Sequence, residues 1–534
     1  MFDALFTTTT EYKKLSHALS GKGACALFGL PASGRAQVYA ALCRQLDKPL
    51  CIVTPGEAEA TRFAADLNTL GIPAAVFPAR DYVLRSIEGT AREYEYRRLA
   101  VLGELVGGRL RAVAVPAEAL TQFTTPKEDF CANTRTLHAG DTLLRDDLLA
   151  ALFGAGYTRR AQVDGPGQFS VRGDIVDIFA PDQKMPVRME FWGDEIDTLH
   201  TFDLTTQRRE DAIDKFYLSP AREVLFGKPA DAAEQLRAFL AKQRGKKKTA
   251  MADCMAADLD LLDGGAVPVN MDKYLVVRYP HPATVLDYFD DPILVAEEPA
   301  SIREADRATA YRRGEELKSL ILDGVLCAGL DNLYADPSYL WSKTGHYRTI
   351  CAENFARSMP DQPLKDIVNA PAHTLPAWNG EVAGLLEDLK PLCDAGYTVT
   401  LLAGTDRAAA GLARDLRDKG ILVTTDAAAA PAAGLVQVLA GHLSAGCEFP
   451  FAKYALLTGR AFGETSSQKK KRKKAKDALN SLTEITPGDL VVHQNHGIGR
   501  YAGIQRMAVQ GVTKDYLRIE YDKKDVLYVP VTQL

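Results

Sequence analysis

The sequence feature that most restricts the fold is the alternation of buried strands and amphipathic helices in the first hundred residues. The segments ACALFGL, LCIVTP and AAVFP are apolar runs short enough to be buried strands. Between them, GRAQVYAALCRQL and EAEATRFAADLNTL have helical spacing, with Val38, Leu42 and Leu46 on one face of the first helix and Gly71 placed to end the second. A β-α-β-α-β order requires a parallel sheet, so we expect a doubly wound α/β domain here.

The first strand runs into GLPASGRA, which has the glycine spacing of a phosphate-binding loop, G-x-x-x-x-G-K-[ST]. Gly29 and Gly34 match the motif, but Arg35 stands in place of the lysine and Ala36 in place of the Ser/Thr. Arginine does not replace a compact ammonium group in a tight cradle, and alanine offers no oxygen to Mg²⁺. We therefore predict a degenerate, helicase-like P-loop that is kept for its fold and does not hydrolyse nucleotide.

Two other pairs of residues are candidate metal ligands. Glu297 and Glu298 end the apolar segment ILVA, and they either face a metal near the loop or lead the strand out of the core into solvent. His493 and His496 suit a metal only on one helical turn, whereas their surroundings are extended and glycine-rich, so the zinc interpretation is weak. No pattern of a catalytic triad, of H-E-x-x-H or of paired catalytic carboxylates is present. The sequence thus predicts no catalytic residues and no metal site.

The remaining chain indicates a multidomain α/β protein. Short strands with glycine turns around residues 168–200 predict an inserted β-rich domain, a second α/β domain begins near Leu375, and the last fifty residues are all strand-like. We divide the sequence into a degenerate P-loop domain (1–126), a β-rich domain (127–210), the rest of the first module (211–365), a second α/β domain (366–464), a basic linker (465–484) and a C-terminal β unit (485–534). The final unit is expected to be a small β barrel or curved sheet.

Charge and composition exclude several classes of protein. The chain has a net charge of −5, yet the run KKKRKKAK at 469–476 carries seven positive charges, so the rest is acidic, unlike a uniformly basic nucleic-acid binder. The run is either a solvated linker or a secondary contact with nucleic-acid phosphates. Nine scattered cysteines without a C-x-x-C pair suggest a reducing cytoplasm, and no apolar run is long enough for a membrane helix.

The strand PVRMEFW in the β-rich domain is a candidate binding surface. Alternation places Val187, Met189 and Phe191 on one face, and Arg188 and Trp192, with the intervening glutamate, on the other. An arginine and a tryptophan on one outward face are typical of protein-binding hot spots. The alternative is structural: a loop covers Trp192, and Arg188 pairs with Glu190 or another nearby acid.

Taken together, these segments resemble the bacterial transcription-repair coupling factors. FSVRGDIVDIFAP and VRMEFWGDEIDTLHTFDLTTQR are similar to the module that this family shares with the excinuclease subunit UvrB. LSAGCEFPFAKYALLTGRAFGE is similar to the end of the family's third domain. GDLVVHQNHGIGRYAGIQRMAVQGVTKDYLRIEYDKKDVLYVPV is similar to its RNA-polymerase-interacting domain, which has a Tudor-like β fold.

The resemblance implies two protein partners and the residues that would meet them. The family's arginines that contact UvrA fall on Arg172, within SVRGD, and on Arg188, and the aromatic residue at the strand tip falls on Trp192. The apolar residue used against the β subunit of RNA polymerase falls on Met507. This resemblance favours the binding interpretation of the face that carries Arg188 and Trp192.

The resemblance also implies that the UvrB-like module does not hydrolyse ATP and that the ATP- and magnesium-dependent motor lies further towards the C-terminus. The sequence ends before any such motif, so we expect an adaptor that holds no cofactor and contacts DNA mainly through the missing motor. It would bind RNA polymerase stalled at a lesion and recruit UvrA. The alternatives are a UvrB-like ATP-dependent DNA helicase and a DNA-binding transcription regulator that uses the basic run.

Overall fold

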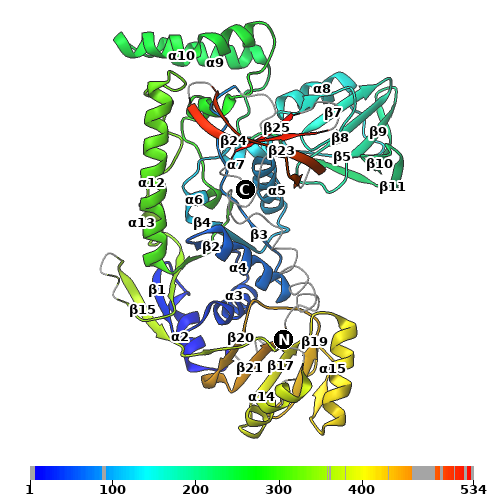
Figure 1. The fold of residues 1–534 in the computed structure, drawn as a ribbon, viewed down its shortest axis with the longest axis vertical. Helices are drawn as coiled ribbons and strands as arrows, with labels where there is room; N and C mark the ends of the chain where they lie inside the picture. Colours follow the sequence, from blue (N-terminus) through cyan, green and yellow to red (C-terminus); the bar gives the residue numbers. More distant parts are fainter. Residues whose placement is uncertain are drawn as a thin grey trace. The chain divides into compact units, whose positions relative to one another are not determined.

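The computed structural model describes residues 7–86, 92–357, 359, 362–378, 381–430, 432–459, 488–493, 497–509, 512–521 and 526–530. The chain divides into two compact units, Met1–Gly459 and Arg460–Leu534 (Figure 1). The predicted linker 465–484, with its basic run, and His496 lie outside the described residues.

A parallel sheet of seven strands forms the centre of the first unit. Its order is β15-β1-β14-β13-β2-β4-β3, and every pair of neighbours is parallel. The strands β1, β2, β3 and β13 lie where the sequence predicts them, and these four predictions are confirmed. The bounds are β1 (Gly23–Phe28), β2 (Leu50–Thr54), β3 (Ala74–Val76), β4 (Ala112–Pro116), β13 (Ile293–Glu297), β14 (Arg348–Glu353) and β15 (Leu364–Asn369).

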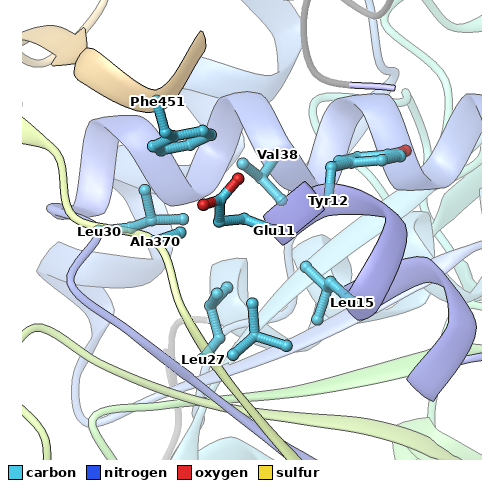
Figure 2. A pocket seen from close by; sticks show the side chains of 9 residues that line it. Glu11, Tyr12, Leu15, Leu27, Leu30, Val38, Ala370 and Phe451 are labelled. Atoms are coloured by element: carbon cyan, nitrogen blue, oxygen red, sulfur yellow. The ribbon is translucent and has the colours of Figure 1, made fainter. Parts of the chain in front are cut away.

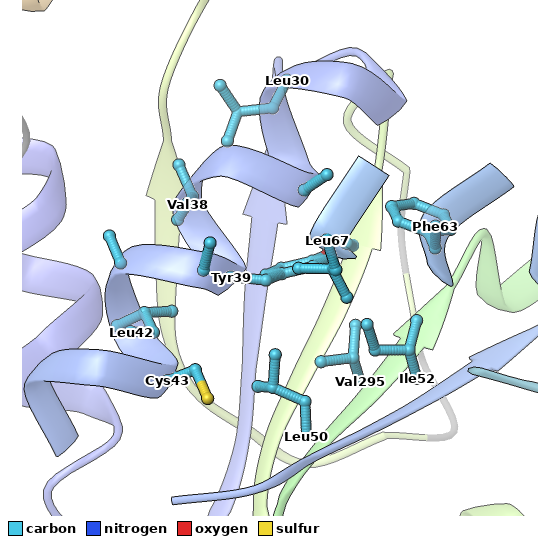
Figure 3. Close-up of a cluster of buried hydrophobic side chains, with 14 of the residues drawn as sticks. Leu30, Val38, Tyr39, Leu42, Cys43, Leu50, Ile52, Phe63, Leu67 and Val295 are labelled. Carbon is cyan, nitrogen blue, oxygen red and sulfur yellow. The ribbon is translucent and has the colours of Figure 1, made fainter. Parts of the chain in front are cut away.

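Both faces of this sheet are covered by apolar side chains. Cys25 and Leu27 of β1 join the cluster around α3 (Ala32–Leu46) and α4 (Glu57–Thr69), whereas Ala26 and Phe28 join the opposite cluster with α5 (Glu93–Val106). Figure 3 shows side chains of α3 and α4 over residues of β2 and β13. Burial on both faces explains why these strands read as continuous apolar runs in the sequence.

Helix α3 is buried on nearly all sides, whereas an amphipathic helix that packs on a sheet keeps one side in solvent. Val38 and Leu42 are buried, as predicted, while Leu46 is only partly buried. The polar residues Arg35 and Gln37 are buried as well. The sequence predicts one buried face, but side chains of the second α/β region join the same cluster and cover the other face.

The second α/β region is a mixed sheet of six strands in the order β16-β20-β21-β17-β19-β18. Strands β21, β17, β19 and β18 are parallel, and β20 is antiparallel to both of its neighbours. The segment RAAAGLARDLRDKG predicts a helix that ends at its last glycine. Gly420, with a φ of +81° just after α15, confirms this prediction. The elements are β16 (His373–Leu375), α14 (Val382–Asp394), β17 (Thr398–Leu402), α15 (Asp406–Asp418), β18 (Val423–Thr424), β19 (Val436–Leu439), β20 (Gly446–Phe449) and β21 (Tyr454–Thr458).

The two α/β regions meet where α3 passes β20. A Cβ atom built on Gly34 would lie 2.9 Å from the Sγ atom of Cys447 and 3.4 Å from the ring of Phe449. Beside this contact, a small cavity of about 10 Å³ is lined mostly by apolar side chains, among them Leu30 and Phe451 (Figure 2). The contact is thus close-packed, and it depends on a glycine.

The β-rich part lies between β4 and β13 in the sequence and forms its own sheet, in the order β11-β10-β9-β8-β7-β6. Neighbours are antiparallel except β6 and β7. The first strand of the β-rich part, β5 (Arg135–His138), pairs with its last strand, β12 (Lys215–Leu218). Helix α8 (Arg145–Gly154) packs on one face of the sheet. The sheet strands are β6 (Thr158–Arg159), β7 (Gln168–Arg172), β8 (Ile175–Phe179), β9 (Val187–Trp192), β10 (Glu195–Phe202) and β11 (Arg209–Ala212).

Helices complete the first unit. The long α12 (Pro299–Leu322) runs between β13 and a helical layer that contains α9 (Pro229–Ala241) and α10 (Gly245–Asp263) (Figure 1). Among the described residues, no helix combines the length and apolar character needed to cross a membrane. The shorter helices are α2 (Thr10–Ala18), α6 (Ala117–Leu120), α7 (Lys127–Ala132), α11 (Leu275–Arg278) and α13 (Tyr339–Lys343).

The second unit contains an antiparallel sheet in the order β22-β23-β24-β25. In the sequence, the alternating segment DYLRIEY is followed by the turn DKKD and by DVLYVPV, which predicts that the two segments pair. The pairing of β24 with β25 confirms this prediction. The bounds are β22 (Leu490–His493), β23 (Gly497–Val509), β24 (Val512–Glu520) and β25 (Val526–Pro530).

We expect Gly34→Ala to destabilise the first unit by about 1–3 kcal/mol, because the added methyl group overlaps Cys447 in a packed core. Gly411→Ala is the matched control, since Gly411 also lies in a helix but has open space around its Cβ position. That change should be neutral or slightly stabilising. Urea denaturation followed by circular dichroism measures both; equal effects of the two variants would contradict the prediction.

Candidate functional site

The degenerate loop between β1 and α3 is shorter than its motif suggests. Only Gly29, Leu30 and Pro31 separate the strand from the helix, so Gly34, Arg35 and Ala36 already lie in α3. Gly29 has a φ of +89° and makes the turn. Gly34, which matches the motif as well, lies in the helix and allows close packing against Cys447. A helix that begins this early leaves no wide backbone cradle for phosphates.

The guanidinium of Arg35 forms ion pairs with two glutamates of the same chain. Its Nε atom lies 3.0 Å from Oε2 of Glu297, and its Nη1 donates to Oε1 of Glu298 at 2.8 Å. The hydroxyl of Tyr39 donates to the other oxygen of Glu297 at 2.5 Å. Glu297 is buried, so the interpretation that the strand leads it into solvent is wrong. Burial raises the pKa of Glu297, and Arg35 partly offsets that shift.

These residues do not fit a magnesium nucleotide. Glu297, the acid that could hold a metal ion here, is already bound by Arg35 and Tyr39. Ala36 supplies no oxygen, and Arg35 is already paired on two sides. Within the described ranges, no group of three or more His, Cys, Asp or Glu side chains is arranged to hold a metal. The arginine that could meet the phosphates of a nucleotide is therefore already paired with Glu297 inside the protein.

On the β-rich sheet, strand β9 alternates as the sequence predicts. Val187, Met189 and Phe191 are buried in the core under α8. Trp192 is 82% exposed, so the interpretation that a loop covers this side chain is wrong. Arg188, in contrast, has a side chain that is only 11% exposed, although it lies on the outer face.

A single buried carboxylate holds both candidate arginines. Asp177 of β8 lies directly across from Arg188 of β9 and is fully buried. Arg188 donates from Nε to Oδ1 at 2.7 Å and from Nη2 to Oδ2 at 2.9 Å, and Arg172 donates from Nη2 to Oδ2 at 2.7 Å. The hydrogen bonds to Asp177 raise the pKa of Arg188 further. Arg172 and Arg188 are therefore brought together and fixed by the same acid.

Arg188 also has contacts that explain its burial. Its guanidinium lies 4.8 Å from the ring centroid of Phe202, and its Nη1 donates to the carbonyl oxygen of Gln207. The acid that pairs with Arg188 is Asp177, not Glu190, because Glu190 instead pairs with Arg209 of β11. The outer face of β9 thus combines a structural feature, the pairing of Arg188 with an acid, with a feature typical of binding, the exposed side chain of Trp192.

Sequence reasoning missed Asp177 and Arg209. The signal for Asp177 was available: in IVDIF it is the one charged residue within an apolar strand, and a buried acid requires a cation. Arg209 lies in a polar segment after a turn, and nothing in its sequence separates it from other surface arginines.

The sites predicted in the second unit are described only in part. Met507 lies in β23, where it pairs with Lys514 of β24, but its side chain is outside the described residues. His493 ends β22 and pairs with Gly497. An extended strand does not have the helical spacing that the histidine pair would need.

We expect Arg35→Met to destabilise the first unit by about 3–5 kcal/mol, because it leaves Glu297 buried without its counter-ion. The double variant Arg35→Met/Glu297→Gln should recover much of this loss, since neither partner is then charged. Urea denaturation measures both.

Arg35→Lys restores the lysine of the motif, yet a fluorescent ATP analogue with Mg²⁺ should show no saturable binding. Micromolar binding to the unmodified chain that Arg35→Ala abolishes would overturn this and support the helicase alternative.

Asp177→Asn should destabilise the β-rich sheet by about 3–5 kcal/mol, because Arg188 loses the charge that compensates it in a buried position. Glu190→Gln, on the same face, should cost less than about 1 kcal/mol, since its arginine is half-exposed. Hydrogen exchange of peptides from residues 168–202 localises the effect. Equal loss of protection in the two variants would show that Asp177 is not the central acid.

Two families match parts of the sequence. Residues 136–224 match the UvrB interaction domain, and residues 485–534 match the CarD-like/TRCF RID domain. Among curated proteins, the chain is similar to the transcription-repair-coupling factors of Bacillus subtilis (28% identity over 523 residues), Staphylococcus haemolyticus (26% over 524) and Staphylococcus aureus (25% over 520). Each match covers 95% of this chain and 44% of the relative. The chain is thus similar to the transcription-repair-coupling factors along nearly its whole length, and it spans less than half of theirs.

Proposed function

We propose that this chain is an adaptor of transcription-coupled repair that binds RNA polymerase through its C-terminal β unit and UvrA through its β-rich sheet. Support comes from the presence of both family domains in one chain, at residues 136–224 and 485–534. The similarity to transcription-repair-coupling factors extends across the regions between them.

The proposed UvrA surface consists of Arg172, Arg188 and Trp192. Arg172 precedes the turn between β7 and β8, and Trp192 precedes the turn between β9 and β10. The two turns are neighbours, because the backbone N–H of Phe191 donates to the carbonyl oxygen of Asp174 at 2.9 Å. The surface therefore presents an exposed aromatic ring and a half-exposed guanidinium on one corner of a sheet.

The observation that carries the proposal is the combination of Trp192, 82% exposed, with an arginine pair held by Asp177. An exposed tryptophan beside an arginine is typical of protein-binding hot spots, whereas a single exposed aromatic side chain is not. Because Asp177 fixes Arg172 and Arg188 in advance, little side-chain entropy is lost when a partner binds. Arg188 acts mainly as support for this corner, and Arg172 and Trp192 make the direct contacts.

The finer parts of the proposal extend the same family comparison. The polymerase partner is the β subunit, and the apolar contact is Met507 of β23. The first sheet is of the doubly wound type, the C-terminal sheet is of the Tudor type, and the adaptor works in the cytoplasm. ATP-driven translocation belongs to the longer relatives, whose further length supplies the motor.

Binding of UvrA and of the polymerase β subunit to the immobilised chain tests the proposal. Each variant at one interface serves as the control for the other interface. On immobilised chain, Trp192→Ala and Arg172→Ala should each reduce UvrA retention at least tenfold and leave the polymerase β subunit bound. Met507→Arg should do the reverse, since an unpaired charge in an apolar contact is costly. Tyr311→Ala removes an aromatic side chain of comparable exposure elsewhere and should change neither.

Loss of both partners in any one of the three interface variants would indicate misfolding rather than a local contact. The adaptor proposal would be wrong if the unmodified chain retained neither protein. Equal UvrA retention by the unmodified chain, Trp192→Ala and Arg172→Ala would show that this corner of the sheet is not the interface.

A further inference from the structure

A cavity of about 270 Å³ lies on the helical side of the first unit, between α12 and the segment 331–337. One stripe of α12 forms its floor, with Asp306, Ala310, Arg313 and Leu317 at helical spacing. The segment 331–337 forms the opposite wall, and it is tied to the end of α6 by a hydrogen bond from Ala335 N to Thr121 O at 2.8 Å. The cavity is therefore framed by backbone that is held in place.

The carboxyl group of Asp306 projects into this cavity without a partner. The residue is only 7% exposed, yet no described side chain or backbone group forms a hydrogen bond or ion pair with its carboxyl oxygens. Burial raises the pKa of Asp306 to about 6, and the charge of Arg313 only partly offsets this. A buried carboxylate that lacks a partner destabilises the fold, so a role in binding is a physical reason for its presence.

Arg313 is not available as that partner. Its Nη1 donates to Oγ1 of Thr121 at 2.8 Å, and its Nη2 donates to the carbonyl oxygen of Glu118 at 2.8 Å. Its guanidinium also lies 4.0 Å from the ring centroid of Tyr334. These contacts direct the guanidinium of Arg313 towards α6, so the carboxyl group of Asp306 faces the cavity without a hydrogen bond from it.

The rest of the lining indicates the charge and the character of a ligand. Asp331 and Asp336 add negative charge to the wall, where one oxygen of each accepts from a backbone N–H of its own loop. Ala310, Leu317 and Pro337 provide apolar contacts. An anion such as a phosphate is disfavoured by three carboxylates, whereas a cation with a short hydrocarbon chain suits both the charge and the apolar wall.

We propose that this cavity binds a small aliphatic amine as its ammonium ion, with Asp306 as the counter-ion. The ammonium group donates to the carboxylate of Asp306, and the alkyl chain lies along Ala310 and Leu317. The proposal does not depend on the adaptor function, since none of these residues lies in the two proposed protein interfaces.

Calorimetric titration of the whole chain at pH 8, where Asp306 is ionised, tests the proposal with butylammonium as the probe and 1-butanol as its neutral counterpart. We expect one butylammonium to bind per chain and 1-butanol to bind at least tenfold more weakly. Asp306→Asn and Ala310→Phe should each weaken butylammonium binding at least tenfold, the first by removing the charge and the second by filling the cavity. Asp336→Asn keeps the oxygen that accepts from its loop and should change the affinity less than about twofold.

The melting midpoint without ligand separates a binding role from a structural one. Since no described group pairs with the carboxylate, Asp306→Asn should melt at the same temperature as the unmodified chain or higher at pH 8. The proposal is overturned if the unmodified chain does not bind butylammonium, if Asp306→Asn binds it equally well, or if 1-butanol binds with the same affinity. A clear fall in the melting midpoint of Asp306→Asn would also overturn it, because Asp306 would then be a structural residue.

Discussion

The close contact between α3 and β20 is the constraint on which the architecture of the first unit depends. Helix α3 lies between two sheets, so both its apolar and its polar side chains must be accommodated without water. A residue without a side chain at Gly34 lets the second sheet approach, and Glu297 and Glu298 compensate Arg35. An open nucleotide site would need this same end of α3 to face solvent. The second α/β region packs on this end of α3, so it covers the place where an open nucleotide site would have to lie.

The same solution recurs on the β-rich sheet: an arginine is buried only where an acid of the neighbouring strand meets it. Arg188 with Asp177 and Arg35 with Glu297 both join residues of different elements, and both leave the apolar packing around them intact. Buried ion pairs of this kind add little net stability compared with apolar residues, but removing one partner is costly. They fix which strands and helices lie together and so contribute specificity to the fold.

Much of the fold could be predicted from the sequence, because apolar runs and glycine stops are local signals. The strands β1, β2, β3 and β13, the alternation of β9 and the pairing of β24 with β25 follow from periodicity alone. The full burial of α3 could not be predicted, since it depends on β20 and β21, which lie far away in the sequence. For the candidate site, alternation placed Arg188 and Trp192 on one face, but the buried position of Arg188 depends on its partner across the sheet. Nothing in the sequence marks Asp306, because only the fold shows that no described group pairs with its carboxyl oxygens.

The pairing of β5 with β12 has a consequence for how such a chain can arise. These strands are the first and last of the β-rich part, and their antiparallel register, from Arg135 opposite Leu218 to His138 opposite Lys215, brings its two ends side by side. The match to the UvrB interaction domain begins within β5 and ends just beyond β12. A stretch of coding sequence joined at this point can be gained or exchanged without altering the connections of the host sheet. The paired ends make this part a portable genetic unit, so its sheet and the surface it presents can evolve separately from the α/β core that carries it.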